Sequence, residues 1–573
     1  MKTKTNQFDY FQLLNLNIYI PDTERINLIA DVVFDELTLP ATNPRIAKVY
    51  LKVVILNLIL NNSISKKLYT AVRMTLSAYN PKSRYNKNKV ARKITDVIHS
   101  LHKASYIDLH LGFNDRVNPI NSYLTKIKAT PKLITITNKP KHKLEIASIG
   151  YRPDTETIII RENKNNKNVD IEYEDTPEIL NYRKLMADYN NLIHSTHIDV
   201  YGRKNNAGIM FGKQKQPIII SQNNKLVRRI FIKDEQQNLT MGRLYGGWWQ
   251  SLNSEYRSRI TFNGIPTVEV DYSGMGIRLL YDKFNKKMDE EDVYDLSLVG
   301  YKHNTHSMED LRPLLKKCLM CMTNSKSRKQ ALEAVRKELR EDTEGKYPRD
   351  INIEHLIDAF AERHQPIKDY FYSSIGNLQY RMDSEIASYV IAYFLYGIKH
   401  RLPKYKITKN SKYFGKKSPL VHKPMLVLAI HDSFIIRADR HQNLQNVMEQ
   451  AYISYMNISP ETKIKTKKEK LEFSKAIYRK INTRTKKPID NIYYRKNLTI
   501  DKKKEAIKKD TELLNRHKKF KSLFATKAQH PPKISKINML KYYSNEEPEN
   551  YTLKNIPKEL RIIRGKKYIK KPI

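Results

Sequence analysis

One carboxylate of this chain, Asp271, stands where a predicted strand gives way to a predicted helix. In the stretch 267–281, TVEVDYSGMGIRLLY, Val268 and Val270 alternate with polar neighbours, as residues of a half-buried strand do. From Met275 onwards the apolar residues follow helical spacing instead. Asp271 could therefore do no more than cap that helix, or it could present its carboxylate to a ligand at the end of the strand.

A second carboxylate, Asp432, occupies a similar position about 160 residues further along the chain. The stretch 425–438, MLVLAIHDSFIIRA, contains two apolar runs separated by a short polar break. This pattern predicts two strands joined by a tight turn with Asp432 at its tip. Two carboxylates at strand ends would suit Mg²⁺, which prefers oxygen ligands and keeps water and substrate phosphates as its remaining ligands. A pair of such ions can activate an attacking hydroxyl and stabilise a leaving pyrophosphate.

These two stretches resemble motifs of known polymerases. DYSGMGIR, which begins at Asp271, resembles motif A of family A DNA polymerases, whose pattern is D-Y-S-x-I-E-L-R. LAIHDSF, which contains Asp432, resembles motif C, which reads HDE in those enzymes and HDSF in single-subunit, phage-type RNA polymerases. The resemblance covers about residues 239–452. It implies an α+β fold with a right-hand polymerase palm (an antiparallel sheet) and helical fingers and thumb. It also implies two Mg²⁺ ions on Asp271 and Asp432, and His431 beside the primer terminus.

A basic helix predicted within 310–336 would receive the incoming nucleotide. Arg312 and Lys316 are four residues apart, so they share one face of this helix. In the polymerase families an Arg and a Lys at this spacing hold the triphosphate. The resemblance therefore implies that role for both, with Lys316 giving a proton to pyrophosphate. Lys317 would take the place of Lys316 if the register shifted by one residue, and a merely solvated basic face would give the same pattern.

The same helix carries Met320 and Asn324 at the next two steps of four. Phage-type RNA polymerases have Met and then Tyr at these steps, so the resemblance implies that Met320 contacts the nucleotide. Asn324 departs from the family pattern and leaves the helix register open. Cys318 and Cys321 have the C-x-x-C spacing of redox or zinc sites, but no second Cys or Cys/His cluster accompanies them. We therefore predict that both thiols belong to a buried helix face.

Two further segments are expected to touch nucleic acid. TMGRLY resembles the T-G-R-L-S-S element of family A and the G-R-x-Y element of phage-type RNA polymerases, which implies that Arg243 contacts the template or primer backbone. A guanidinium suits that role because its fork matches phosphate oxygens. Gln379 corresponds to the Gln of a family helix that lies against the primer–template. Trp248 and Trp249 could stack on bases, but we favour core packing for both.

The residues of motif A also bear on the sugar of the nucleotide. Gly276 stands where family A DNA polymerases carry a Glu that blocks a 2′-hydroxyl, and phage-type RNA polymerases also have Gly there. Without a side chain, steric exclusion of ribonucleotides is hard to arrange. Gly276 and Met320 thus favour RNA synthesis or a relaxed sugar choice. Tyr272, expected at the nucleotide, and Arg278, expected at nucleic acid, favour the DNA polymerase branch, so the sugar stays open.

The composition indicates a polyanionic partner. The chain has 573 residues, a net charge of +44 and a pI near 9.8. Such a charge favours nucleic acid, because Lys and Arg displace counterions from phosphates, although the richness in Lys, Asn, Ile and Tyr is also typical of an AT-rich genome. The nearest approach to a membrane span, Val49–Leu60, contains Lys52. We expect a DNA template, a primer and nucleoside triphosphates as partners, no membrane, and an intracellular location in a bacterial cytoplasm or a mitochondrion.

Four regions are predicted along the chain. Residues 1–80 form a helical N-terminal region, and 81–175 are strand-rich and basic. The second region fits a winged-helix nucleic-acid-binding module or, equally well, an ordinary subdomain with a solvated basic face. Residues 176–458 form the polymerase core of palm and fingers. Residues 459–573 form a basic C-terminal extension, which would track phosphate backbones or form a solvated tail.

Together these patterns predict a DNA-templated nucleotidyltransferase, in first place a replication DNA polymerase or primase-polymerase of a mobile or organellar element. No acidic trio of a proofreading exonuclease occurs in the first half of the sequence. A single-subunit, DNA-directed RNA polymerase is the alternative within the same class. The alternative from another class is a non-catalytic, DNA-binding replication initiator with a decayed palm. Asp271, Asp432 and Arg243 argue against decay, and Asn324 favours it.

Overall fold

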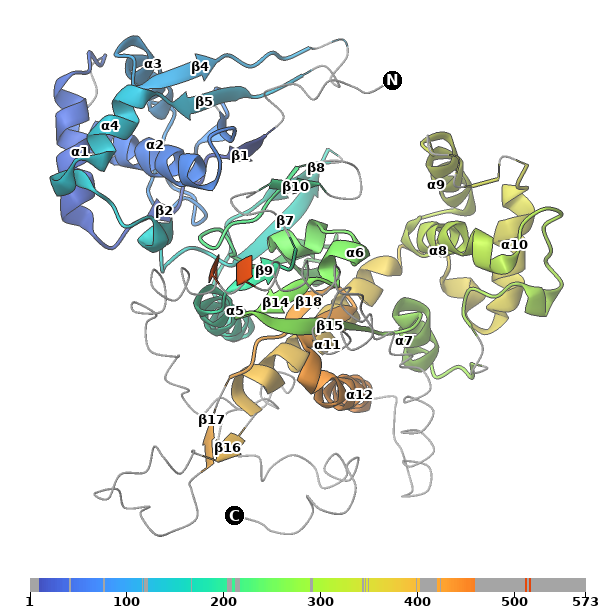
Figure 1. Cartoon of the computed structure of the whole chain (residues 1–573). Helices are drawn as coiled ribbons and strands as arrows, with labels where there is room; N and C mark the ends of the chain where they lie inside the picture. The colour runs from blue at the N-terminus through green and yellow to red at the C-terminus, as the bar shows by residue number, and fades with distance from the viewer. Residues whose placement is uncertain are drawn as a thin grey trace, which may run out of the picture.

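The computed structural model (Figure 1) describes most of the first 458 residues. The described residues are 10–458 apart from 41–42, 76–77, 116, 118–121, 166, 203–208, 212–216, 289–291, 343–344, 346, 349, 398, 402–419 and 423, together with 511–512 and 515–516. Within them, helices and mostly antiparallel sheets are mixed, which confirms the predicted α+β class. The predicted extension 459–573 lies almost entirely outside the described residues.

Buried apolar side chains form two separate clusters. One runs from Ile18 to Ile149, and the other from Ile158 to Met456. The first belongs to an N-terminal domain, coloured blue in Figure 1, and the second to a larger core domain. The predicted division near residue 80 therefore falls inside a single hydrophobic core. The helical spacing of the first 80 residues gives no sign of their short strands, which complete a sheet with strands from beyond residue 100.

The N-terminal domain packs helices against a four-stranded sheet of order β1-β3-β5-β4. Its elements are β1 (Phe11–Leu13), β2 (Ile18–Tyr19), α1 (Thr23–Asp35), α2 (Pro44–Ile64), β3 (Tyr69–Val72), α3 (Ile94–Lys103), β4 (Ile107–His110), β5 (Thr125–Ala129) and α4 (Pro131–Asn138). Strand β1 pairs parallel to β3, whereas β3, β5 and β4 are antiparallel. The helix α3 leads directly into β4, and β4 and β5 form a hairpin.

Helix α2 is the central element of this domain. Asn43 caps its start, and Pro44 occupies the first turn, where its missing N–H costs no hydrogen bond. Among the described residues, α2 is the one helix whose length and composition would allow it to cross a membrane. About two-thirds of that apolar stretch is buried within the protein. The apolar side chains of α2 thus pack in the core of the N-terminal domain.

The core domain contains two sheets, of order β13-β12-β7-β8 and β18-β19-β15-β14-β9. Their strands are β7 (Ile158–Lys164), β8 (Lys167–Asp170), β9 (Ile198–Val200), β12 (Arg228–Lys233), β13 (Leu239–Tyr245), β14 (Ile260–Phe262), β15 (Ile265–Asp271), β18 (Leu428–Ile430) and β19 (Ser433–Arg437). Small two-stranded pairs are β2 with β6 (Gly150–Tyr151), β10 (Ile209–Phe211) with β11 (Pro217–Ile219), and β16 (Lys399–Arg401) with β17 (Leu420–His422).

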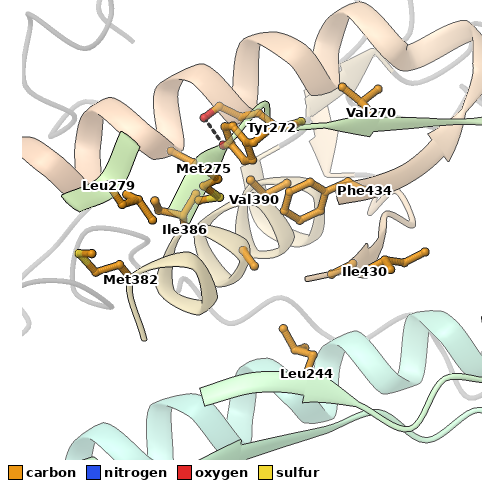
Figure 2. Close-up of a cluster of buried hydrophobic side chains, with 14 of the residues drawn as sticks. Leu244, Val270, Tyr272, Met275, Leu279, Met382, Ile386, Val390, Ile430 and Phe434 are labelled. Carbon is orange, nitrogen blue, oxygen red and sulfur yellow. Dashed lines mark hydrogen bonds between the residues drawn. The ribbon is translucent and has the colours of Figure 1, made fainter. Parts of the chain in front are cut away.

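Helix α11 connects these parts, because it packs against β13, α7, α8 and α12. The helices of the core domain are α5 (Pro177–Ser195), α6 (Ser254–Arg257), α7 (Met275–Lys283), α8 (Met308–Asn324), α9 (Arg328–Arg340), α10 (Ile353–Arg363), α11 (Gly376–Ala392) and α12 (His441–Ile458). Figure 2 shows the apolar contact at the centre. The ring of Phe434 on β19 lies beside Val390 of α11, and Val270 of β15 and Met275 of α7 belong to the same cluster. These contacts fix the end of β15 relative to the helices around it.

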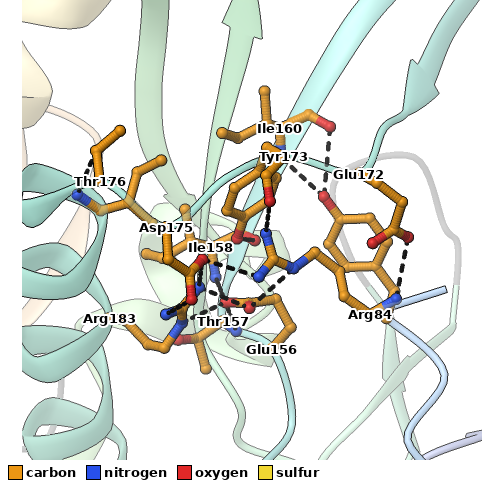
Figure 3. Close-up of polar contacts among 12 residues, drawn as sticks. Arg84, Glu156, Thr157, Ile158, Ile160, Glu172, Tyr173, Asp175, Thr176 and Arg183 are labelled. Carbon is orange, nitrogen blue, oxygen red and sulfur yellow. Dashed lines mark hydrogen bonds and ion pairs between the residues drawn. The ribbon is translucent and has the colours of Figure 1, made fainter.

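A polar network joins the two domains (Figure 3). The guanidinium of Arg84 lies 3.7 Å from the ring of Tyr173, donates to its carbonyl at 2.7 Å, and pairs with Asp175 at 2.8 Å. Arg183 of α5 pairs with Asp175 and with Glu156, which is buried. These shared carboxylates hold the segment before α3 against the start of the core domain.

Candidate active site

The two predicted carboxylates meet at one end of the β15–β19 pair. Asp271 is the last residue of β15 and lies opposite Ser433, the first residue of β19. The backbone N–H of Tyr272 donates to the carbonyl oxygen of Asp432 at 3.3 Å. Ile430 also lies opposite Ser433, so only two residues form the turn between β18 and β19. The structure thus brings Asp271 and Asp432 side by side from positions far apart in the sequence.

The turn that carries Asp432 is conformationally unusual. His431 has a positive φ of 57°, in a region that side chains other than Gly enter only at a cost. The His431 ring packs edge-on against Tyr245, 5.8 Å between ring centroids. Burial, together with Arg243 and Arg257, lowers the pKa of His431 to about 4. His431 is therefore neutral at physiological pH and adds no charge beside the aspartates.

The electrostatic surroundings of Asp432 favour an added cation. Burial raises the pKa of Asp432, Glu269 raises it further, and Arg243 and Lys316 act in the opposite direction. A divalent cation would favour the charged form of Asp432 and so offset the cost of its burial. Asp271 and Asp432 offer oxygen donors only, which fits Mg²⁺. No group of three or more His, Cys, Asp and Glu side chains is placed to hold a metal within the part of the chain that the structure describes. Any ion here would therefore complete its ligands with water and substrate oxygens.

A third carboxylate below the pair is already neutralised. Glu269 of β15 is buried and accepts two hydrogen bonds from Arg257, both at 3.0 Å. It also accepts one from the hydroxyl of Ser433 at 2.9 Å. A bidentate pair of this kind is strong and fixes geometry. Glu269 thus supports the strand end beneath Asp271 and Asp432.

Arg243 reaches this site through a bulge in β13. Ile230 pairs with Arg243 but Phe231 pairs with Met241, so Gly242 is an extra residue in the ladder. Gly242 has a φ of 87°, and a Cβ there would lie 2.8 Å from the Phe231 ring. A bulge with Gly in the left-handed region bends the strand and re-aims the next side chain. The Gly before the Arg in TMGRLY is explained in this way.

The Arg243 guanidinium is held on two sides. Its Nε donates to Asp383 of α11 at 3.0 Å, with a second, shorter contact from Nη2, and its centre lies 3.9 Å from the Tyr380 ring. Burial raises the pKa of Asp383 to about 6, Arg243 opposes that rise, and Asp432 adds to it. Arg243 therefore stands next to Asp432 with one carboxylate as its partner and an aromatic ring as its platform.

Helix α8 turns a basic face toward the same site. Ser307 and Asp310 form a capping box that fixes where the helix begins. Arg312 and Lys316 then lie over the ring of Tyr294, 5.2 and 5.5 Å from its centroid. Burial raises the pKa of Tyr294 to about 12, and Asp432 and Asp271 both contribute to the rise. Tyr294 thus lies between the basic face of α8 and the two aspartates.

The side chains of α8 also settle the choice between two lysines. Lys317 pairs with Glu338 of α9 at 2.9 Å and so faces the neighbouring helix. Lys316 is the lysine whose charge acts on Asp432. Arg312 is held by Asp292 of the preceding loop, with Nη2 to Oδ1 at 3.2 Å. The structure therefore places Arg312 and Lys316 on the site side of α8.

Three residues expected at the nucleotide or nucleic acid are instead buried. The Tyr272 hydroxyl donates to the carbonyl of Met448 at 2.5 Å, and Arg278 Nε donates to a backbone carbonyl at 2.9 Å. The amide of Gln379 donates to the carbonyl of Gly276 at 2.9 Å. All three side chains are at most 6% exposed. Tyr272 thus packs against α12, and Gln379, itself on α11, packs against α7. The contacts with substrate or nucleic acid expected for Tyr272, Arg278 and Gln379 stay predictions.

The remaining positions fall as follows. A Cβ on Gly276 would lie 3.4 Å from Gln379 Nε2, so any longer side chain would displace that amide. Met320 is 43% exposed. Asn324 donates to the Tyr380 hydroxyl at 3.1 Å, and a Cβ on Gly376 would lie only 2.1 Å from Asn324 Oδ1. Helices α8 and α11 thus approach so closely at this point that a side chain in place of Gly376 would displace Asn324.

Buried aromatic and sulfur side chains confirm two core predictions. Trp248, Trp249, Cys318 and Cys321 are all buried in the core cluster. Sequence reasoning missed Tyr294, Glu269, Asp383 and Tyr380 at the site; these four are assembled from a loop, a strand and a helix. The one local signal is the acidic run before Tyr294, which is unusual in so basic a chain.

Comparisons with known proteins add no relative. The chain matches no protein-family model, no curated protein and no solved structure.

Proposed function

We propose that this protein is a template-directed nucleotidyltransferase whose core domain acts as a polymerase palm with α8 as its fingers helix. The observation that carries the proposal is the pairing of Asp271 with the β18–β19 turn, facing the Arg312 and Lys316 side of α8. Carboxylates beside a separate basic face meet the needs of phosphoryl transfer, which depends mainly on positioning and electrostatics. The preferred form is a replication DNA polymerase or primase-polymerase, and a single-subunit RNA polymerase is the alternative.

Asp271 and Asp432 would hold two Mg²⁺ ions in this reaction. When bound, the ions supply Lewis-acid stabilisation of the attacking and leaving oxygens. The carboxylates fix the place of the reacting phosphate relative to the strand ends, and Glu269 keeps that end rigid through Arg257. The neutral His431, in its strained turn, borders the position of the primer terminus.

Arg312 and Lys316 would neutralise the triphosphate. Both are permanently or ordinarily cationic, and both lie over Tyr294, which directs them toward the aspartates. Asp292 holds Arg312 in place before the substrate arrives. The 3′-hydroxyl would attack the α-phosphate, the bond to the β-phosphate would break, and Lys316 would give its proton to the departing pyrophosphate. Met320, exposed on the same helix, would border the nucleotide.

The template and primer would pass beside Arg243. Its guanidinium, oriented by Asp383 and Tyr380, is suited to a phosphate or base edge close to Asp432. Gly276 leaves no side chain beside the sugar, and Gln379 closes the space behind it. This arrangement favours acceptance of a 2′-hydroxyl.

A non-catalytic replication initiator is the second candidate. It is favoured by the contact of Asn324 with Tyr380 and Gly376, which closes the end of α8 against α11. It is opposed by the cost of keeping Asp432 desolvated beside Glu269 without a cation to bind.

Primer extension on a single-stranded DNA template tests the proposal, with dNTPs and rNTPs supplied separately. Asp271→Ala and Asp432→Ala should each abolish Mg²⁺-dependent extension, by more than the roughly 10–100-fold that loss of an outer metal partner costs. Asp439→Ala is the matched control, because Asp439 is exposed just beyond the far end of β19 and, among the described residues, pairs only with the neighbouring Arg437 and Arg440. Extension by neither nucleotide, with DNA still bound, would favour the initiator. Extension that survives both substitutions would exclude these carboxylates.

A further inference from the structure

The hairpin of β4 and β5 extends beyond the sheet of the N-terminal domain. Phe113 and Tyr123 form an additional bridge, with backbone hydrogen bonds of 3.0 and 2.9 Å in both directions. At Gly112 a Cβ would lie 2.5 Å from Thr125 N, so the two strands approach there as only glycine allows. The Gly112 N–H also donates to the Thr125 hydroxyl at 2.9 Å. The hairpin is therefore an ordered projection at this level.

Large apolar side chains point outward from this projection. Leu111, Phe113 and Tyr123, here called the apolar tip, are 61%, 53% and 56% exposed. The two rings lie 6.2 Å apart between centroids. Half of the exposed large apolar residues in the described part of the chain lie on β1 and this hairpin. These side chains do not pack in the hydrophobic core. Exposed apolar residues that gather in this way indicate a surface that binds a partner.

The helix that leads into the hairpin is basic on its outer side. Ile94, Val97, Ile98 and Leu101 of α3 are fully buried against the N-terminal core. His99 and Lys103, four residues apart, are exposed on the outer side, and Arg92 is exposed just before the helix. Between residues 81 and 130 there are ten Lys or Arg, three Asp and no Glu, a net charge of +7.

We propose that α3 and the apolar tip form a second, separate site for double-stranded DNA. The exposed Arg92 and Lys103 would contact phosphates, and the rings of Phe113 and Tyr123 would enter a groove and stack on or wedge between bases. Basic residues neutralise phosphates, and apolar side chains from projecting elements insert between base steps. The helix followed by an antiparallel hairpin is an arrangement that places both elements on one duplex.

The charge of the surface selects this partner over others. A protein interface would also use aromatic residues, but it would not require a one-sided excess of positive charge around them. Aromatic rings on the hairpin and basic side chains on the helix that leads into it match the stacked and anionic faces of nucleic acid, although Asp115, which contacts Ser122 next to Tyr123, is acidic. The site lies on the surface of the N-terminal domain and shares no residue with the candidate active site.

Tryptophan fluorescence of the full-length chain tests the proposal directly. Trp248 and Trp249 are the only tryptophans and both are buried, so Phe113→Trp adds one exposed reporter. Titration with a 30-base-pair duplex should quench that reporter and protect it from acrylamide. Leu28→Trp, at a position 41% exposed on α1 of the same domain, is the matched control and should show neither effect. An unquenched Phe113→Trp reporter at saturating duplex would overturn the proposal.

Affinity measurements separate the rings from the charges. Phe113→Ala with Tyr123→Ala should weaken duplex binding about fivefold to a hundredfold without changing the salt dependence. Arg92→Ala with Lys103→Ala should lower the slope of log affinity against log salt by about 2. Loss of self-association instead of DNA affinity, seen by sedimentation, would assign the tip to an interface between copies and contradict the proposal.

The result does not depend on catalysis. Asp432→Ala should bind the duplex and quench the Phe113→Trp reporter as the unchanged chain does. Failure of primer extension together with normal quenching would remove the proposed polymerase and keep this DNA site. Normal extension without quenching would remove this DNA site and keep the proposed polymerase.

Discussion

The two domains bury different kinds of polar group. In the N-terminal domain the buried polar side chains are mostly amides and hydroxyls, and Lys126 is the only buried Asp, Glu, Lys or Arg among the described residues. In the core domain the buried side chains include charged ones of both signs. They are Glu156, Asp199, Lys225, Arg229, Glu269, Arg278, Arg363, Asp383, Glu385 and Glu449.

The amides of the N-terminal domain satisfy backbone groups locally. Asn57 accepts from the N–H of Asn15 and donates to two carbonyls, and Asn88 donates to the carbonyls of Leu16 and Ile18. Around the candidate active site, by contrast, Arg243 meets Asp383, and Arg257 meets Glu269. In the N-terminal domain, neutral amides are enough to satisfy the backbone groups that folding buries. Buried charges are costly, and two of them, Glu269 and Asp383, act on Asp432.

The largest effect should come from breaking a buried ion pair. Arg229 donates to Glu385 at 2.7 Å, and both are buried. Arg229→Met leaves Glu385 without that partner and should destabilise the core domain by about 3–5 kcal/mol. Urea unfolding followed by fluorescence of the buried tryptophans measures this change. Adding Glu385→Leu should recover much of the loss. A double variant as unstable as Arg229→Met would show that the unpaired carboxylate of Glu385 is not the cause of the destabilisation.

A smaller effect is expected from α8. Lys316→Ala should reduce extension by about a hundredfold, because one charge aimed at the transition state is lost. Lys317→Ala removes the same charge one residue away but breaks only the pair with Glu338, so its rate should be close to normal. Steady-state extension with varied nucleotide concentration gives both values. Equal losses in the two variants would show that net charge alone matters.

The N-terminal domain should lose less from a comparable change. Asn57→Leu leaves the N–H of Asn15 and the carbonyl of Val53 without their side-chain partners and should cost about 1–3 kcal/mol. Asn27→Leu is the control, because Asn27 binds only the exposed end of Lys52 among its described contacts. Thermal unfolding by circular dichroism compares them. A loss as large as that of Arg229→Met would erase the contrast between the two domains.

The last effect concerns pH. Burial lowers the pKa of Lys225 to about 7, although its ammonium donates to the carbonyl of Thr196 at 2.7 Å. Between pH 7 and about 10.4, the ordinary lysine pKa, the unfolded chain binds this proton and the folded chain does not, so stability should rise with pH. Below pH 7 both states bind it and the contribution becomes constant. Melting temperatures of the unchanged chain and Lys225→Met should converge as pH rises from 7 to 9.5. A constant difference would contradict the lowered pKa.

The sequence predicted those parts of the site that depend on local pattern. Alternation before Asp271 and the polar break at Asp432 predicted a strand end and a tight turn, and the structure pairs them directly. The four-residue spacing of Arg312 and Lys316 placed them on one face of α8, and the pairing of Lys317 with Glu338 fixed the register.

What the sequence left out depends on tertiary packing. Nothing in the pattern around Tyr272 or Gln379 distinguishes a buried side chain from one that meets a substrate, because the helices that cover them, α12 and α7 respectively, are distant in the sequence. Tyr294 belongs to a loop without periodicity. The strands of the N-terminal domain are two to five residues long, too short for a reliable alternation signal.

The two cysteines have a practical consequence. Cys318 and Cys321 are both buried on α8, and burial raises the pKa of each thiol, so neither holds a reactive thiolate at neutral pH. The unchanged chain should therefore resist maleimide. Single cysteines added at the hairpin tip and on α9 would then accept dyes selectively. Energy transfer between them would follow the distance between the two domains when a duplex is added.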